Sequence, residues 1–241
     1  MFVKAIQSSR NSIFPIIQTL SKNGHYVNRN VAGTGFFIDD KGHFVTALHV
    51  VGQIDNPDFS FGSLGNVPYA NFNGIQPEEI IEVGRIPKMD LFIGRLTATK
   101  LSPLKLLANN PPEGRSIVIG GYPFPNITKL ASGGLNFYTV RQYWQSTMIM
   151  DHILLSHFNP SLKYNGFLVD KRAIPGMSGG PVLGLDGQVV GMCTAQITRA
   201  AKDRVPNING VCLDAKSLYV GINTILSGLP SNLKMTGNIL N

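Results

Sequence analysis

The sequence lacks most of the features that mark secreted, membrane-spanning or metal-binding proteins. It has only two cysteines, Cys193 and Cys212, and their spacing fits neither a metal-binding Cys-x-x-Cys motif nor a disulfide framework. No stretch approaches the roughly 18 consecutive apolar residues that a membrane-spanning helix needs. Polar residues interrupt the apolar ones within residues 1–20 before a signal-peptide core develops. These absences favour a cytoplasmic protein in a reducing compartment, with no metal, no cofactor and no membrane partner.

Positive charge is in excess but is not concentrated. Lysine and arginine number 21 against 14 acidic residues, which gives a net charge of +7. The sequence has no long basic run and no basic stripe interleaved with aromatic residues, which are the patterns of nucleic-acid-binding segments. The charge therefore indicates a soluble surface, and a nucleic-acid partner is not expected.

What the sequence does contain is a series of short apolar runs separated by turn residues. Examples are GTGFFI, HFVTAL, DLFIGRL and SIVIGGY, and 26 glycines and 15 prolines supply the turns between such runs. This spacing predicts an all-β sandwich or barrel. The 241 residues, 43% of them hydrophobic, suffice for one all-β domain of the two-barrel kind or for two small domains. Helical signals lie only near the ends, in SSRNSIFPIIQTL, which Pro15 interrupts, and in DAKSLYVGINTILSGL, which begins with a capping aspartate.

One segment, IPGMSGGPVLGLDGQVVGM at 174–192, places a serine between glycines. Gly176 and Gly179 permit backbone turns that a Cβ would prevent, so several N–H groups can point into one small volume and bind negative charge. If Ser178 attacks a carbonyl, the N–H groups of Gly176 and Ser178 are the predicted oxyanion hole. A glycine-rich hairpin with an incidental serine is the alternative interpretation.

A nucleophilic serine needs a base, and His49 is the candidate among the five histidines. It ends GTGFFIDDKGHFVTALHVV, in which two predicted strands joined by a turn at 39–42 lead into a short segment. A packed or surface histidine is the alternative. That alternative is the expected status of the other histidines, which are His25, His43, His152 and His157.

These segments together resemble the chymotrypsin-fold (trypsin-like) serine proteases, and they are most similar to the bacterial HtrA-type branch. TALHVV is similar to the Thr-x-x-His-Val-Val of that branch, and KMDLFIGRL resembles the strand that carries the third member of the triad. VDKRAIPGMSGGPVLGLDGQVVGMCTA resembles the stretch around the nucleophile. Weaker likenesses are EGRSIVIGGYPFP and NGVCLDAKSL, and the whole resemblance runs in order over residues 32–226.

The resemblance implies two six-stranded antiparallel β-barrels of the chymotrypsin type packed face to face, with short N- and C-terminal helices. It divides the chain into an N-terminal segment at 1–30, a protease domain at 31–226 and a C-terminal tail at 227–241. The expected parts of the domain are a first barrel at about 31–100, a second barrel at about 112–213 and a closing helix at about 214–226. HtrA-type proteins usually carry a peptide-binding PDZ domain after the protease domain, and none is expected here.

His49, Asp90 and Ser178 occur in the family's His-Asp-Ser order, 41 and 88 residues apart. The resemblance implies a serine endopeptidase that cleaves polypeptides through an acyl-enzyme intermediate, in intracellular processing or quality control. His49 would take the Ser178 proton and return it to the leaving amine, while Asp90 would hold the other ring nitrogen. A strand-end aspartate that caps a turn is the alternative for Asp90, and the other candidate acids are Asp55, Asp58 and Asp151.

The specificity pocket is assigned by resemblance alone. Its walls would come from 171–176 and from the strand at 192–196, where Thr194 and Ala195 leave a cavity of modest depth. Because no acidic residue occupies the approach, a small or medium apolar side chain is expected before the scissile bond. Entry of Arg172 into the pocket is the alternative.

Activation by N-terminal cleavage is not expected. Zymogen-forming members of the family have an aspartate just before the nucleophile, where this sequence has Met177, and a thioether cannot pair with a buried ammonium. No Arg/Lys-Ile-Val-Gly-Gly junction precedes GTGFF. Regulation is expected instead from substrate, partner or oligomer contacts, and the apolar SIFPII segment leaves a homo-oligomer open.

Two functions of other classes remain as alternatives. One is a catalytically silent protease-fold module that binds peptides in the same cleft, against which the complete His-Asp-Ser set argues. The other is a nucleic-acid-binding β domain, which only the net charge of +7 favours.

Overall fold

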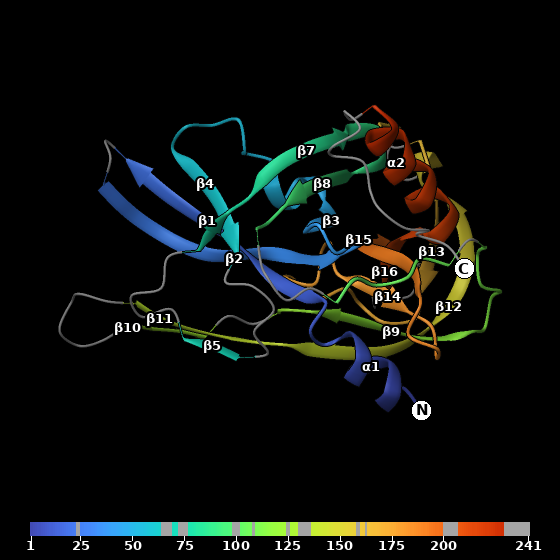
Figure 1. Ribbon diagram of the computed structural model, residues 1–241. Helices are drawn as coiled ribbons and strands as arrows, with labels where there is room; N and C mark the ends of the chain where they lie inside the picture. The colour runs from blue at the N-terminus through green and yellow to red at the C-terminus, as the bar shows by residue number, and fades with distance from the viewer. Residues whose placement is uncertain are drawn as a thin grey trace.

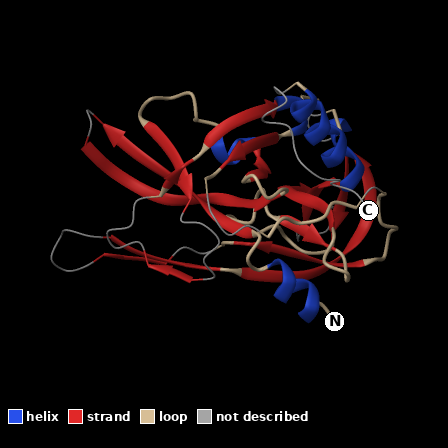
Figure 2. Ribbon diagram, in the orientation of Figure 1, coloured by secondary structure: helices blue, strands red, loops and turns tan. Residues whose placement is uncertain are grey.

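The computed structural model describes residues 1–22, 25–63, 69–71, 77–97, 102–107, 109–123, 126–129, 136–157, 160–161, 163–199 and 207–228. Nearly all the regular structure is antiparallel β-sheet, with helices α1 (Val3–Ser9) and α2 (Ala215–Ser227) at opposite ends of the chain (Figures 1 and 2). Among these residues, no helix has the length and apolarity needed to cross a membrane.

The N-terminal half is a seven-stranded sheet in the order β6-β4-β1-β2-β3-β8-β7. Its strands are β1 (Ile13–Lys22), β2 (His25–Phe37), β3 (His43–Ala47), β4 (Phe59–Ser63), β6 (Glu78–Glu79), β7 (Ile81–Ile86) and β8 (Leu91–Arg95). Buried phenylalanines fill its interior: the Phe14 ring lies 4.7 Å from that of Phe37 and 5.0 Å from that of Phe44, centroid to centroid. Burial of these large rings is the main stabilising contribution in this half.

The C-terminal half is a closed barrel of six strands in the order β12-β13-β16-β15-β14-β9. Its strands are β9 (Ser116–Gly121), β12 (Tyr143–Leu154), β13 (Asn165–Val169), β14 (Pro181–Leu183), β15 (Val189–Arg199) and β16 (Asn207–Asp214). The side chains that pack inside it include Ile117, Ile119, Val169 and Phe167. A separate three-stranded sheet contains β5 (Tyr69–Asn71), β10 (Asn126–Lys129) and β11 (Asn136–Arg141).

The predicted all-β fold class with terminal helices is confirmed, and the second barrel closes with six strands as expected. The first half is a sheet of seven described strands with β6 and β7 at its two edges, and it is consistent with the predicted double barrel. Only Ile80 separates β6 from β7, so one continuous segment pairs with β4 at its start and with β8 beyond it. The domain boundaries stay predictions, although β1, within the predicted N-terminal segment, pairs with β2 along its length.

The N-terminal helix lies earlier than the sequence indicated. It covers Val3–Ser9, and most of the segment expected to be helical forms β1 instead. Pro15 cannot donate the hydrogen bond that a helix interior requires, whereas in β1 it sits opposite Thr34 within a strand pair. The apolar residues around it are buried on both faces of the strand, with exposures of 0–1% at Ile13, Phe14, Ile16 and Ile17.

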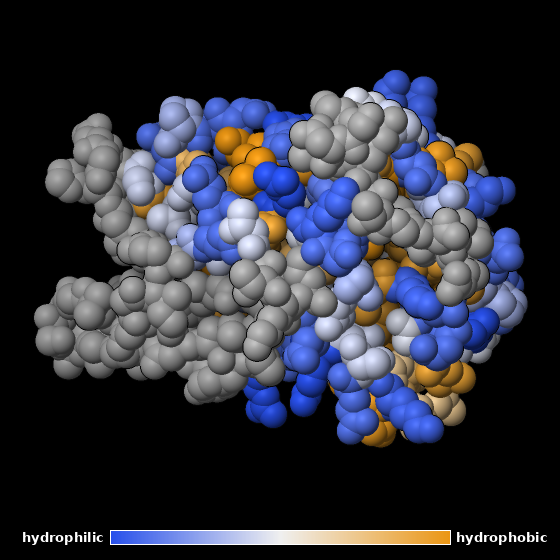
Figure 3. All heavy atoms as spheres, viewed as in Figure 1, coloured by the Kyte–Doolittle hydropathy of each residue, from blue (hydrophilic) through white to orange (hydrophobic). Residues whose placement is uncertain are grey.

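The C-terminal helix begins as predicted. The side chain of Asp214 accepts a hydrogen bond from the Ser217 backbone N–H at 2.7 Å, which caps the first turn of α2. Leu218 and Ile222 then face the protein interior, and both are fully buried. On the face visible in Figure 3, the described surface is largely hydrophilic, with small separate apolar areas.

Candidate active site

His49 and Asp90 are brought together by the pairing of β3 with β8. Ala47 at the end of β3 lies opposite Leu91 at the start of β8, so the residues just beyond these two positions are neighbours. His49 follows in the 3-10 helix η1 (Leu48–Val51), and Asp90 follows the 3-10 helix η2 (Pro87–Met89). The Leu48 N–H also donates to the Asp90 carbonyl at 2.8 Å, which fixes the two turns to each other.

The Asp90 carboxylate contacts His49 through both of its oxygens. Oδ1 accepts from the His49 backbone N–H at 2.9 Å, and Oδ2 lies 2.7 Å from Nδ1 of the ring. An ionised carboxylate can only accept, so the proton lies on Nδ1 and leaves Nε2 free to accept another. The His49 side chain is 49% exposed while that of Asp90 is 16% exposed, so the ring faces solvent and the acid lies behind it.

Asp90 also has an unusual backbone. Its φ is +50°, the one positive value at a described residue other than glycine. Aspartate tolerates this left-handed conformation better than most residues, at a cost of about 1–2 kcal/mol. The adjacent hydrogen bonds to His49 and Leu48 hold the turn in place.

Ser178 follows a tight turn at 174–177, in which the Met177 N–H donates to the Ile174 carbonyl at 3.0 Å. Proline fixes a negative φ at 175 and Gly176 has φ +95°, so this is a type II turn, which needs glycine at its third position. Gly179 is constrained more tightly, with φ +81° and space for no Cβ: an added Cβ would lie 2.1 Å from Thr46 Oγ1. The glycines on both sides of Ser178 are therefore required by the backbone.

The carbonyls of the Gly176–Ser178 tripeptide are all occupied. Gly176 O accepts from Thr34 Oγ1 at 2.7 Å, Ser178 O accepts from the Thr34 N–H at 2.9 Å, and Met177 O accepts from the Gly180 N–H at 2.9 Å. The N–H groups of Gly176 and Ser178, in contrast, donate to no backbone carbonyl within the described parts of the chain. These are the two donors predicted for the oxyanion hole.

Ser178 lies beside the histidine-bearing turn. A Cβ added to Gly33 would lie 2.6 Å from the Val50 side chain and 2.8 Å from Ser178 O. Val50, which follows His49 in the same turn, and Ser178 therefore both lie close to Gly33. Ser178 Oγ donates to the Thr194 carbonyl at 3.4 Å, a long and therefore weak hydrogen bond. The three predicted catalytic residues thus lie in one region, and their catalytic roles stay predictions.

The predicted pocket residues differ in exposure. Thr194 is 2% exposed, and its hydroxyl donates to the Val211 carbonyl at 3.2 Å. Its side chain therefore makes a hydrogen bond within the barrel. Ala195 and Arg172 are exposed. The Arg172 carbonyl accepts from Gln145 Nε2 at 3.3 Å, which ties the approach segment to β12.

The remaining candidates lie elsewhere. His43 pairs with Asp39 at 2.6 Å inside the first sheet, and His152 Nε2 lies 2.9 Å from the Pro111 carbonyl. The side chains of the other two non-catalytic histidines lie outside the described residues. Hydrogen bonds from Arg85 hold the pKa of the exposed Asp55 carboxyl below its usual value, and the other two candidate acids, Asp58 and Asp151, are exposed.

Tyr164 is a residue of this region that the sequence did not indicate. It is 4% exposed, burial raises the pKa of its hydroxyl, and the nearby Asp90 charge raises that pKa further. The phenol is therefore neutral and lies close to the acid. Only tertiary structure brings it there, and no local pattern signals it.

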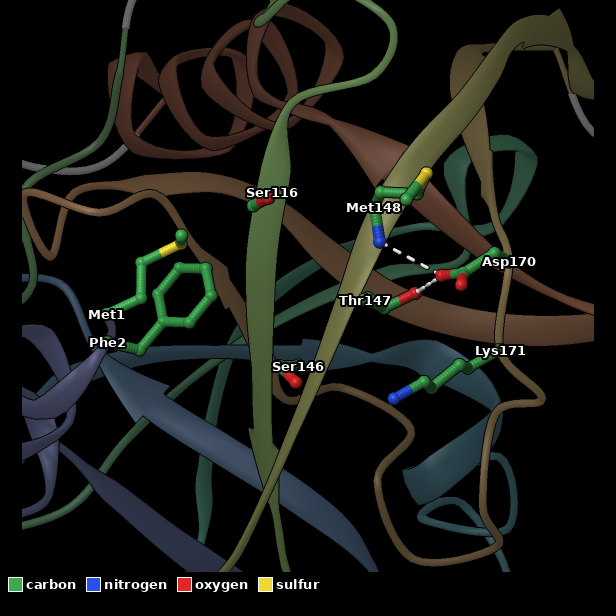
Figure 4. Close-up of a pocket in the computed structure, with 8 residues that line it drawn as sticks. All are labelled: Met1, Phe2, Ser116, Ser146, Thr147, Met148, Asp170 and Lys171. Atoms are coloured by element: carbon green, nitrogen blue, oxygen red, sulfur yellow. Dashed lines mark hydrogen bonds between the residues drawn. The ribbon is translucent and has the colours of Figure 1, made fainter.

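A pocket of about 410 Å³ lies at the C-terminal barrel, and His49, Asp90 and Ser178 are not among its lining residues (Figure 4). It is lined by Met1, Phe2, Ser116, Ser146, Thr147, Met148, Asp170 and Lys171. Burial opposes ionisation of Asp170, but hydrogen bonds from the Thr147 hydroxyl and the Met148 N–H hold its pKa below the usual value. These contacts anchor the start of the segment that leads to the serine turn.

The sequence matches the family model for the trypsin-like peptidase domain over residues 33–192. The chain therefore belongs to the trypsin-like peptidase family and is a serine peptidase. No curated protein sequence matches it significantly.

Solved structures with a similar fold include HtrA-type proteases, as the sequence predicted. The HtrA-type protease AlgW with a decapeptide is 15% identical, with a TM-score of 0.67 over 95% of this chain and 68% of that chain. The active form of the Rv3671c protease from M. tuberculosis is 22% identical, with a TM-score of 0.62 over 96% and 88% of the two chains. Deg5 is 18% identical, with a TM-score of 0.63 over 95% of each chain.

Proposed function

We propose that this peptidase is an endopeptidase that cleaves polypeptides with Ser178 as nucleophile, His49 as general base and Asp90 as the acid that orients the base. The observation that carries the proposal is the double contact of Asp90 with His49, at 2.9 and 2.7 Å. It is supported by the N–H groups of Gly176 and Ser178, which donate to no backbone carbonyl of the described residues. The peptides bound to AlgW are consistent with a polypeptide substrate.

In the first half of the reaction, Ser178 Oγ leaves its weak hydrogen bond to Thr194 and attacks the scissile carbonyl carbon. His49 Nε2 takes the hydroxyl proton as the new C–O bond forms, and Asp90 stabilises the imidazolium. The carbonyl oxygen gains negative charge and accepts from the N–H groups of Gly176 and Ser178. The C–N bond then breaks, and His49 returns the proton to the leaving amine.

In the second half, water attacks the acyl-enzyme carbonyl. His49 takes a proton from the water and gives it to Ser178 Oγ when the ester bond breaks, which frees the carboxylic acid product and restores the enzyme. Each proton leaves and arrives at a named atom, so the cycle needs no metal or redox partner.

We also propose that the residue before the scissile bond is small or medium and apolar. Arg172 supports this proposal, because its side chain is exposed to solvent and the approach segment contains no acidic residue. The reducing, cytoplasmic setting stays a proposal too. It is supported by Cys193 and Cys212, which lie opposite each other on β15 and β16 as free thiols.

A fluorophosphonate probe, which reacts with activated serines, tests the assignment of the nucleophile and base. The native chain should be labelled, whereas Ser178→Ala and His49→Ala should not be, and Ser156→Ala serves as a control at a serine in the 3-10 helix η3 (Leu155–His157). Circular dichroism should show all four proteins folded. Absence of labelling in the native chain would favour the catalytically silent peptide-binding module.

A further inference from the structure

Thr34 connects the two halves of the molecule at the serine turn. It lies in β2 of the N-terminal sheet and is fully buried, with an exposure of 0%. Figure 1 shows β2 running from the outer end of that sheet toward the strands of the C-terminal barrel. Four hydrogen bonds involve this one residue, and two of them go to carbonyls of the Gly176–Ser178 tripeptide.

The hydroxyl and the backbone of Thr34 act on the tripeptide together. Thr34 Oγ1 donates to Gly176 O at 2.7 Å, and the Thr34 N–H donates to Ser178 O at 2.9 Å. Both carbonyls therefore face β2. The hydroxyl oxygen also accepts from the Tyr122 N–H at 3.1 Å, so its donor direction toward Gly176 is fixed.

The same residue is tied to the strand that carries the base. Thr46 Oγ1 donates to the Thr34 carbonyl at 2.8 Å, and Thr46 lies in β3, which leads directly into η1 and His49. The proposed nucleophile and base come from different halves of the chain. Thr34 is thus the residue that touches the serine turn on one side and the histidine-bearing strand on the other.

We infer that Thr34 is a positioning residue, whose hydroxyl holds the Gly176–Ser178 tripeptide in register with His49 for attack on the substrate. The inference rests on the proposed function of Ser178 and His49. Loss of the hydroxyl frees the Gly176 carbonyl and leaves the Tyr122 N–H without its acceptor, so the tripeptide can shift against the base. A shift of about 1 Å in a reacting group can slow a reaction by about 100-fold.

Three variants test the inference by hydrolysis of a peptide substrate. Thr34→Val keeps the shape of the side chain and removes the hydroxyl, Thr34→Ser keeps the hydroxyl, and Thr224→Val removes a hydroxyl in α2 that bonds to the Val220 carbonyl and not to the tripeptide. We expect kcat to fall by about 10- to 100-fold in Thr34→Val with KM nearly unchanged, and to stay within about threefold in the other two. An unchanged kcat in Thr34→Val, or equal losses in Thr34→Val and Thr224→Val, would overturn the inference.

Hydrogen exchange by NMR gives a readout that does not need activity. The Gly179 N–H donates to Cys193 O at 2.7 Å, and it reports on the closure of the serine turn. Its exchange should be faster in Thr34→Val and native-like in Thr34→Ser, and equal exchange in all variants would overturn the inference. If the native chain fails to react with the fluorophosphonate probe, the proposed function fails, while this exchange pattern still decides whether Thr34 holds the turn.

Discussion

Asp90 holds His49 at two points, the backbone N–H at 2.9 Å and ring Nδ1 at 2.7 Å, so it fixes both where the histidine lies and which way its ring faces. A single hydrogen bond to the ring would leave the ring free to swing about it. The second bond removes that freedom, because backbone and side chain are held by one rigid carboxylate. The same contact sets the tautomer of the His49 ring. An ionised carboxylate accepts hydrogen bonds and cannot donate one, so the ring proton lies on Nδ1.

Replacement of Asp90 by asparagine should therefore preserve the fold and remove most of the activity. An asparagine amide can donate to Nδ1, which moves the ring proton to Nε2 and prevents that atom from accepting the Ser178 proton. We expect kcat to fall by roughly 10⁴-fold, measured by peptide hydrolysis across a pH series. Asp55→Asn, at an exposed acid paired with Arg85, is the control and should retain native turnover. Native-like activity in Asp90→Asn would assign the role to another acid.

Gly179→Ala should destabilise the protein and abolish activity. The residue has φ +81°, and an added Cβ would lie 2.1 Å from Thr46 Oγ1 and 2.3 Å from the Thr34 carbonyl. The left-handed backbone and the overlap together should lower the free energy of unfolding by about 2–5 kcal/mol.

Gly114→Ala separates the two causes. Gly114 also has a positive φ, +74°, but an added Cβ there would meet nothing within 4 Å. Chemical denaturation should show a loss of about 1–2 kcal/mol for Gly114→Ala, with unchanged turnover. Equal losses in the two variants would mean that the close approach at Gly179 carries no cost of its own.

The Asp170 carboxylate should contribute to stability in a pH-dependent way. Its pKa in the folded protein lies below the ordinary value of 3.8, so its contribution is present above that value and is lost as the pH falls through the lower, folded pKa. Asp170→Asn should accordingly be less stable than the native chain at pH 6 and should approach it in strongly acidic solution. Thermal melting at a series of pH values measures this, and a constant difference between the two proteins at all pH values would contradict it.

The peptidase should react without N-terminal cleavage. Met177, just before the proposed nucleophile, is fully buried among apolar side chains of the barrel, and its thioether cannot pair with a freed amine. A chain whose N-terminus is blocked by a fused tag should be acylated by the fluorophosphonate probe at the native rate, with mass spectrometry to confirm that it stays intact. If only trimmed protein reacts, an activation step exists that Met177 does not reveal.

The sequence by itself determined the features that depend on neighbouring residues. Short apolar runs between glycines and prolines indicated an all-β fold, and the Asp214 cap marked the start of the last helix. The glycines around Ser178 predicted a backbone with free N–H groups, because positive φ is a property of single residues and their immediate neighbours. The Ser178 motif could be identified for the same reason, since its residues are contiguous.

Tertiary structure alone decided the features that depend on strand pairing. Asp90 meets His49 across 41 positions and Thr34 meets Gly176 across 142, through strand pairing and through packing of one half on the other that no local pattern encodes. The placement of Tyr164 near Asp90 has the same origin. At Pro15 the local signal pointed against a helix, because proline cannot donate a backbone hydrogen bond. Burial of its neighbours on both faces of β1 then selected a strand for this segment. A local pattern restricts the conformations open to a segment, and long-range burial and hydrogen bonding select among them.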